Sequence, residues 1–420
     1  MNITEKNYNK LSNIVYLLDP KHKNYAPYLK ENGIYNFGNT KFQILKTKEN
    51  SSSNGMQAMA VAPIIHGKVD ISQVVIAFAG TNQADLKDLE TDVRSVMNLY
   101  GNRPFSSDLE KRMANTLLHV TGLKTAGQVD AAADFAEEVQ KKYSQATIST
   151  TGHSLGEFLA LYVASENQWK NVGFNGPDPY ELLSPEAKEW VEENPGMLTN
   201  YRNRADFIGN FGGNGTDAEI KVDMNMGFQN PLAYHSLSSW TFDQEGQLII
   251  PDHEANTLAR QKQQEAQAMS LFTAGISELE ILRRTFTASG GQLSSNEKIY
   301  LEDTQALLVA ENLSQTMKRA MERVIRINQD GIEALEENWR EGLKRARYVA
   351  PALNEQELME ALASVGATRE NLVDSPKEMY QLRIDKAKKM GESFDGLIQE
   401  IKAKIHEIVD RDRELARQLR

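Results

Sequence analysis

The chain has 420 residues, a formal net charge of −11 and no cysteine. This length exceeds what one hydrophobic core usually holds, so two or more domains are expected. The acidic balance argues against nucleic acid as a partner, because phosphate binding needs a basic face. The lack of cysteine excludes disulfides, a thiol nucleophile and cysteine metal sites.

The N-terminus has no apolar segment of the kind that directs secretion. Residues 1–7 are mostly polar, and no run in the chain approaches the roughly 20 apolar residues of a membrane span. We therefore expect a cytoplasmic protein, or one that is exported without a cleaved signal peptide.

The first elements in chain order are helical and then extended. Residues 1–35 show the apolar face of one or two short helices, and residues 41–48 and 56–64 fit the two strands of a hairpin. Residues 74–79 form a continuous apolar run, which predicts a strand buried on both faces. The run ends in a turn before Thr81. This turn is either a site where main-chain N–H groups bind an anion or an ordinary turn at the end of a strand.

A nucleophile elbow is indicated in the middle of the chain. Residues 125–143 form an amphipathic helix, and residues 100–123 before it are either a connecting helix or a cover over a site. Residues 152–156 read Gly-His-Ser-Leu-Gly, between strand-like residues 146–149 and a helix-like run. In this motif the serine stands on a strained strand-to-helix turn. Ser154 is the candidate nucleophile, against the alternative of a structural turn.

Further strands and a long helical region follow the elbow. Residues 171–177 and 197–204 fit strands, so the alternation with helices predicts a mostly parallel sheet covered on both faces. The character changes near residue 251, and we predict domains at 1–250 and 251–420.

The C-terminal domain shows no strand pattern. Its apolar residues recur at three- and four-residue steps, the coiled-coil spacing. Helix starts are indicated by Ser294 with Glu297, by Asn354 with Glu357, and by Ser375 before a proline. The pattern predicts an elongated all-α helical bundle, with its apolar faces either packed within the chain or left open for partner helices.

A serine hydroxyl needs a base to take its proton and an acid to orient that base. In sheet hydrolases these residues follow in the order Ser, then Asp or Glu, then His. His235 follows the last predicted sheet strand, so we prefer it as the base over His253, at the domain junction, and His406, in the last helix.

Asp206 is the preferred acid, because it ends a strand at the carboxyl edge of the sheet, where sites form. Asp178 follows a strand one step too early, and Asp223 and Asp252 are weaker candidates. The oxyanion site needs two backbone donors, which we assign to Leu155 and to Thr81. No metal-ligand or phosphate-loop pattern occurs, so neither a metal nor a cofactor is expected.

Taken in order, these segments resemble the sequence blocks of class 3 lipases. The resemblance implies an α/β-hydrolase fold, a triad of Ser154, Asp206 and His235, and oxyanion donors at Thr81 and Leu155. It implies a serine esterase or lipase that cleaves acyl esters of lipids, of the phospholipase A type. The blocks are residues 76–81 with Asp92, residues 151–156, residues 201–206, and Tyr234 and His235 with Trp240, within residues 40–245.

Two positions depart from the lipase pattern. Ala79 stands where the family has arginine, and Glu157 replaces the second glycine after the elbow. With Glu157 the elbow is similar to that of malonyl-type acyl-carrier transacylases, although their N-terminal Gly-Gln-Gly-Ser block is absent. An acyltransferase or thioesterase that uses the same serine is therefore an alternative.

The whole architecture resembles the lipase toxins of Gram-positive type VII secretion, in which the helical part is an LXG-type targeting domain. The resemblance implies a secreted antibacterial toxin, with small helical proteins and an immunity protein as partners. A function of another class also follows, in which the helical domain is a secretion or assembly module and the enzyme is its cargo.

Overall fold

The computed structural model divides the chain into two compact units, Met1–Ser270 and Leu271–Arg420. The sequence pattern places the boundary earlier, after residue 250. The observed boundary lies within α7 (Thr257–Ala288), because the first turns of that helix belong to the first unit, where Ala259 joins the core. The residues described are 3–37, 40–50, 55–80, 127–206, 208–210, 212–227, 231–288 and 293–418.

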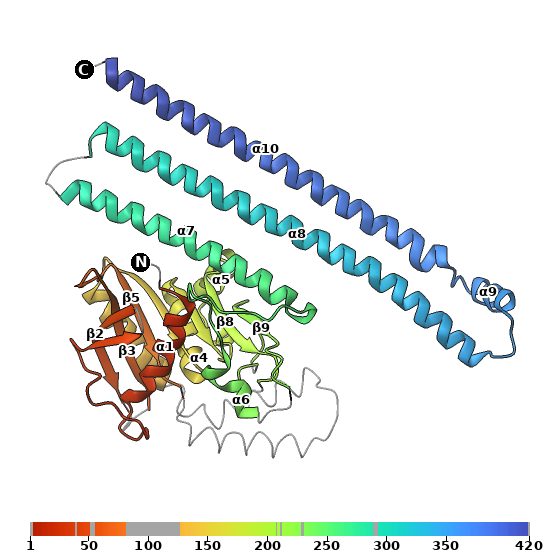
Figure 1. Ribbon diagram of the computed structural model, residues 1–420, viewed down its shortest axis with the longest axis horizontal. Helices are drawn as coiled ribbons and strands as arrows, with labels where there is room; N and C mark the ends of the chain where they lie inside the picture. The colour runs from red at the N-terminus through yellow and green to blue at the C-terminus, as the bar shows by residue number, and fades with distance from the viewer. Residues whose placement is uncertain are drawn as a thin grey trace. The chain divides into compact units, whose positions relative to one another are not determined.

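In the described part of the chain, nine strands form one sheet (Figure 1). The order across it is β1-β2-β3-β5-β6-β7-β8-β9, with β4 paired to β3. Strands β5 to β9 run parallel, and β1 to β3 join them antiparallel, so the predicted α/β class is confirmed. The strands are β1 (Ile34–Phe37), β2 (Thr40–Glu49), β3 (Gln57–Ile65), β4 (Lys68–Val69), β5 (Gln73–Phe78), β6 (Thr147–Gly152), β7 (Lys170–Phe174), β8 (Leu198–Asn203) and β9 (Glu219–Val222).

Helices lie on both faces of this sheet. The predicted hairpin is confirmed as β2 and β3, whereas β9 is a strand that the sequence pattern does not predict. The helices of the first unit are α1 (Glu5–Ile14), η1 (Val15–Leu18), the segment over residues 127–142, α4 (Leu155–Asn167), η2 (Tyr180–Leu182), α5 (Pro185–Glu193), α6 (Pro231–His235), η3 (Leu237–Ser239) and η4 (Glu254–Asn256).

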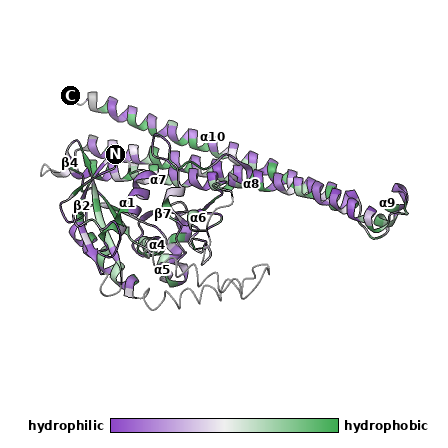
Figure 2. Ribbon diagram, turned by 60° about the horizontal axis from the view of Figure 1, so that its bottom comes forward, coloured by the Kyte–Doolittle hydropathy of each residue, from purple (hydrophilic) through white to green (hydrophobic). Residues whose placement is uncertain are grey.

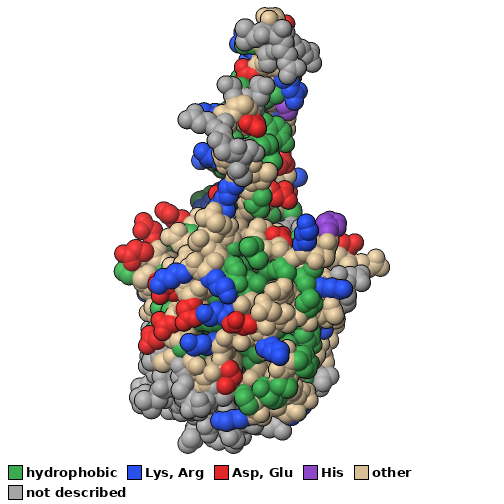
Figure 3. Space-filling model, turned by 90° about the vertical axis from the view of Figure 1, so that its left-hand side faces the viewer, with side chains coloured by type: hydrophobic (Ala, Val, Ile, Leu, Met, Phe, Trp, Pro, Cys, Tyr) green, Lys and Arg blue, Asp and Glu red, His purple; other side chains and the backbone are tan. Residues whose placement is uncertain are grey.

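The two faces of the sheet carry separate cores, as β5 illustrates. Ile76 packs on one face with Phe135, from the helix over residues 127–142, and with α4. Ala77 packs on the other face with Leu11 of α1. Because side chains alternate along a strand, a strand buried on both faces is apolar throughout. On the surface visible in Figure 3, acidic and basic side chains are interspersed with hydrophobic ones, so no field of a single sign covers it.

The second unit is built on two long antiparallel helices, α8 (Ser295–Val349) and α10 (Ser375–Gln418), which are joined through α9 (Glu355–Ser364). The ion pairs Glu311–Lys402 and Glu336–Lys377 cross between them and show their antiparallel direction. Hydrophobic and hydrophilic residues alternate along both helices (Figure 2). The predicted long helical region is confirmed. Among the described residues, no helix is both long enough and apolar enough to cross a membrane.

Helix α10 is entered differently from the prediction. The capping boxes predicted at Ser294 and Asn354 both form. Helix α10 begins at Ser375, as predicted, but Ser375 is not its N-cap, because a π-helical turn over Glu370–Asp374 leads directly into the helix. Ser375 already has helical backbone angles, φ −63° and ψ −45°. Its hydroxyl donates to Glu370 Oε1 at 2.9 Å instead of capping a backbone N–H.

Candidate active site

Ser154 stands at the sharp turn between β6 and α4. Its φ of 59° and ψ of −131° lie in a region that non-glycine residues rarely adopt, so the surrounding structure must hold the turn in place. The Ser154 N–H donates to the Phe174 carbonyl at the end of β7 at 3.2 Å. On the other side, a Cβ at Gly156 would come within 2.7 Å of the Gly80 nitrogen, after β5. The elbow is therefore clamped between the ends of two strands.

The predicted base and acid form a buried pair. His235 Nδ1 lies 2.8 Å from Asp206 Oδ2, and the two side chains are 3% and 1% exposed. Since a carboxylate can only accept, it selects the imidazole tautomer with its proton on Nδ1. His235 Nε2 is then a buried acceptor with no hydrogen-bond partner among the residues that the structure describes. A general base uses an imidazole nitrogen in this state.

The turn after β8 holds the Asp206 carboxylate in place. Its Oδ1 accepts from the Ile208 N–H at 2.9 Å. The Asn210 side chain donates both to the Asp206 carbonyl at 2.6 Å and to the Asn203 carbonyl at 2.8 Å. These hydrogen bonds fix the conformation of the turn. The backbone of the turn therefore holds the Asp206 carboxylate in the position from which it orients His235.

Asn175 holds the base from the other side. Its Nδ2 donates to the His235 carbonyl at 3.0 Å, and its Oδ1 accepts from the Asn203 N–H, also at 3.0 Å. Asn175 itself has a positive φ of 53°, a conformation that asparagine tolerates better than most residues. One side chain thus links the ends of β7 and β8 to α6. Sequence reasoning missed this role, because nothing in the local pattern around Asn175 distinguishes it from a turn residue.

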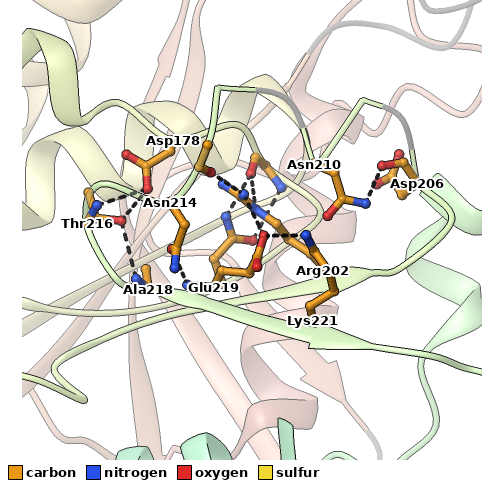
Figure 4. A network of polar contacts seen from close by, with 12 residues as sticks. Asp178, Arg202, Asp206, Asn210, Asn214, Thr216, Ala218, Glu219 and Lys221 are labelled. Atoms are coloured by element: carbon orange, nitrogen blue, oxygen red, sulfur yellow. Dashed lines mark hydrogen bonds and ion pairs between the residues drawn. The ribbon is translucent and has the colours of Figure 1, made fainter. Parts of the chain in front are cut away.

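A buried network of polar side chains holds the loop between β8 and β9 in place (Figure 4). The Arg202 side chain is 1% exposed. It donates to the carbonyls of Gly176 at 2.9 Å and Gly213 at 2.7 Å, and to Glu219 at 3.1 Å. Asp178 belongs to the same region, where its Oδ2 accepts from both the backbone and the hydroxyl of Thr216. Asp178 therefore stabilises this loop and does not orient His235.

The other acids and bases considered lie elsewhere. Asp252 forms an ion pair with Arg260 at 3.0 Å, and its side chain is 95% exposed. Asp223 accepts from the Asn225 N–H, while its backbone carbonyl is 3.2 Å from His253 Nε2. His406 is an exposed residue of α10, in the second unit. The structure pairs His235 with Asp206 and with none of these.

The predicted oxyanion donors are placed in part. Leu155 is the first residue of α4, so its amide lies at the positive end of the helix dipole, directly after the nucleophile. Thr81, the second predicted donor, lies outside the described residues, as do Asp92 and the segment 100–123 that could cover the site. Gly80, next to Thr81, is described and lies against the elbow.

Glu157 is buried next to the elbow. It is 0% exposed, and burial raises the pKa of its carboxyl well above 4.5, against weaker opposing effects of Asn171 and Arg202. Asn171 donates to its Oε2 at 3.4 Å, whereas its Oε1 has no hydrogen-bond partner in the described chain. The side chain lies where Gly173 and Gly176 leave space, and a Cβ on either glycine would overlap it. Burial therefore favours the neutral, protonated form of the Glu157 carboxyl.

The comparisons with known proteins place few limits on this chain. No protein-family model matches it, and no curated protein matches it. One solved structure, the native Rhizomucor miehei lipase propeptide complex, aligns at 18% sequence identity and a TM-score of 0.21. The alignment covers 40% of this chain and 51% of that chain, so it spans about half the length of the lipase.

Proposed function

We propose that the first unit is a serine carboxylic-ester hydrolase with an α/β-hydrolase architecture. One observation carries this proposal: the strained Ser154 elbow lies beside a buried Asp206–His235 pair whose Nε2 has no partner among the described residues. A strained backbone and an unpartnered buried imidazole nitrogen each cost stability. Their occurrence together is typical of a catalytic centre and has no evident structural purpose.

In the proposed reaction, the Ser154 hydroxyl oxygen attacks the ester carbonyl carbon while His235 Nε2 takes the hydroxyl proton. Asp206 stabilises the imidazolium that forms, and the Leu155 amide donates to the oxyanion. The imidazolium then returns its proton to the departing alcohol, which leaves an acyl group on Ser154. Water, activated by the same imidazole, releases the acid and regenerates the serine.

We further propose that the esters are acyl esters of lipids, as in a phospholipase A. The support for this step is the order of the class 3 lipase blocks in the sequence. Water and another nucleophile can compete for the acyl group on Ser154, so the alternative, acyl transfer, predicts a different product. Comparing free acid with acylated alcohol or thiol acceptor in one reaction decides between hydrolysis and transfer.

The test compares Ser154→Ala with Ser165→Ala, which removes a buried hydroxyl from the following helix, α4; the Ser165 hydroxyl donates to the Leu161 carbonyl at 2.8 Å. A fluorophosphonate probe should label the wild type and Ser165→Ala, but not Ser154→Ala. Release of fatty acid from phospholipid vesicles should follow the same pattern. Equal labelling or equal release by Ser154→Ala refutes the proposed nucleophile.

We also propose that the second unit binds helical partner proteins, in agreement with its expected role in targeting and export. Helix α10 keeps a row of apolar side chains exposed although it pairs with α8. Co-expression with small helical proteins encoded beside its gene should give a complex that Ile408→Glu disrupts. A chain that stays monomeric with each of them contradicts this proposal. The exposed side chains include Met390, Leu397, Ile401, Ile408 and Leu415.

A further inference from the structure

The hydroxyl of Tyr16 reaches the elbow from the N-terminal segment. Tyr16 belongs to η1, directly after α1, and its hydroxyl oxygen lies 2.9 Å from His153 Nδ1 and 3.2 Å from the His153 carbonyl oxygen. The two residues are 137 positions apart in the chain. His153 directly precedes Ser154, so a side chain near the N-terminus contacts the residue beside the candidate nucleophile.

The partners of the His153 ring determine its tautomer. His153 Nε2 lies 2.7 Å from the His235 carbonyl oxygen, which can only accept, so Nε2 carries a proton and donates it. Burial, and then the charge of His235, lower the pKa of His153 to about 3, so the ring is neutral and its Nδ1 has no proton. Nδ1 must therefore accept. The single proton of the Tyr16 hydroxyl faces both Nδ1 and the His153 carbonyl oxygen, and we assign it to Nδ1, because Nδ1 is nearer and the carbonyl already accepts from the Gly156 N–H at 3.0 Å.

The same contact places His153 against the base. The centroids of the His153 and His235 rings are 4.7 Å apart, with an interplanar angle of 43°. Together with Asn175, the His153 Nε2–H fixes the His235 carbonyl, and with it the backbone from which the base projects. A neutral neighbouring ring also does not repel the imidazolium that forms on His235 during the proposed reaction.

Tyr16 also touches the strand end that leads to the second predicted oxyanion donor. A Cβ at Gly80 would come within 2.6 Å of the Tyr16 hydroxyl and 2.5 Å of the His153 carbonyl oxygen. Burial raises the pKa of the Tyr16 hydroxyl, and a hydrogen bond from the Gly80 backbone opposes this increase. The hydroxyl thus accepts from Gly80 and donates to His153, which places it between β5 and the elbow.

We propose that Tyr16 is a positioning residue of the candidate active site. Its hydroxyl donates to Nδ1 and so fixes the orientation of the His153 ring, His153 in turn holds the backbone of His235, and the same hydroxyl holds the strand end at Gly80. This inference rests on the proposed hydrolase function for its effect on rate. The hydrogen bonds that it assigns to the His153 ring, and the resulting tautomer, can be measured whether or not the protein cleaves an ester.

The first test is nitrogen-15 NMR of the histidine side chains in the full chain, with the His153 signals assigned from their loss in His153→Gln. Wild type should show a neutral His153 with its proton on Nε2. Tyr16→Phe should keep the proton on Nε2, from which the His235 carbonyl accepts, but should shift the Nδ1 signal, because that nitrogen loses its hydrogen bond. A protonated ring, or a proton on Nδ1, in the wild type overturns the proposal even if no variant folds.

The second test uses Tyr8→Phe as a matched control. The Tyr8 hydroxyl is also buried and comes from the same segment, but it donates to Ser149 Oγ at 3.0 Å, within β6 and away from the His153 ring. Tyr16→Phe should lower the rate of fluorophosphonate labelling and kcat about fivefold to tenfold, with KM nearly unchanged, as expected for loss of one orienting hydrogen bond.

The outcomes separate this inference from the proposed function. A wild type that neither labels nor cleaves esters contradicts the function, while the NMR measurement still decides the tautomer. Equal losses of rate in Tyr16→Phe and Tyr8→Phe indicate a general loss of packing and overturn the positioning role. Full rate in Tyr16→Phe, or an unchanged Nδ1 signal of His153 in that variant, overturns it as well.

Discussion

Replacing Glu157 by glutamine should make the first unit more stable at neutral and alkaline pH. The carboxyl is 0% exposed, and the Asn171 side chain donates to it over a long distance of 3.4 Å. Burial raises its pKa above 4.5 in the folded state. Glutamine has nearly the same shape as the protonated acid and cannot ionise, so the substitution isolates the effect of the proton.

The sign follows from proton binding in the two states. Above pH 4.5 the unfolded chain loses the Glu157 proton, whereas the folded chain keeps it. The free energy of unfolding therefore falls as pH rises, by at most about 1.4 kcal/mol per pH unit, until the pH reaches the folded-state pKa. The advantage of Glu157→Gln should be small near pH 4.5 and grow by up to about 2.7 kcal/mol between pH 5.5 and 7.5.

Urea unfolding at several pH values, followed by tryptophan fluorescence, measures this difference. Glu186→Gln provides the control, since it removes a carboxyl from an exposed position in the first turn of α5. Its stability difference from wild type should not show the steep dependence expected for Glu157→Gln. Parallel curves for wild type and Glu157→Gln over the whole range would mean that Glu157 is ionised in the folded protein, and would refute the reasoning.

Two further substitutions test the acid and the loop that carries it. Asp206→Asn should lower kcat by about 10³- to 10⁴-fold, because an amide lets His235 adopt the wrong tautomer; steady-state ester hydrolysis measures this, and a loss below tenfold contradicts the pairing. Arg202→Met should lower the free energy of unfolding by about 3–5 kcal/mol, because it leaves Glu219 and two carbonyls without their buried donor. Urea unfolding checks that value, and a change under about 1 kcal/mol would show that the network is not stabilising.

The central strands and the elbow follow from local sequence. The continuous apolar run of residues 74–79 specifies a doubly buried strand, and glycines two positions before and after Ser154 allow a turn that other residues would block. Strand β9 could not be predicted in the same way. Its four residues, Glu219–Val222, include two charged side chains, and they are strand only because β8 offers them an edge.

The interactions around the site depend on contacts that chain order does not specify. Asp178 and Asp206 both follow strands, and only the fold shows that Thr216 engages the first and His235 the second. Tyr16 and His153 are in contact although 137 positions separate them in the sequence. Ser375 begins α10, as its sequence pattern predicts, but the preceding π-helical turn already holds it in helical conformation, so it does not act as an N-cap.

The contact of Glu157 with two glycines constrains the order in which these positions can change. A side chain at Gly173 would overlap the Glu157 carboxyl, and a side chain at Gly176 would overlap its Cβ and Cγ. Shortening Glu157 to glycine first would free Gly173, whose nearest obstacles are all atoms of the Glu157 side chain. It would not free Gly176, where an added Cβ would also come within 2.9 Å of the Ser154 carbonyl oxygen. Substitutions near this elbow can therefore occur first at residue 157 and then at residue 173, whereas residue 176 has to remain glycine.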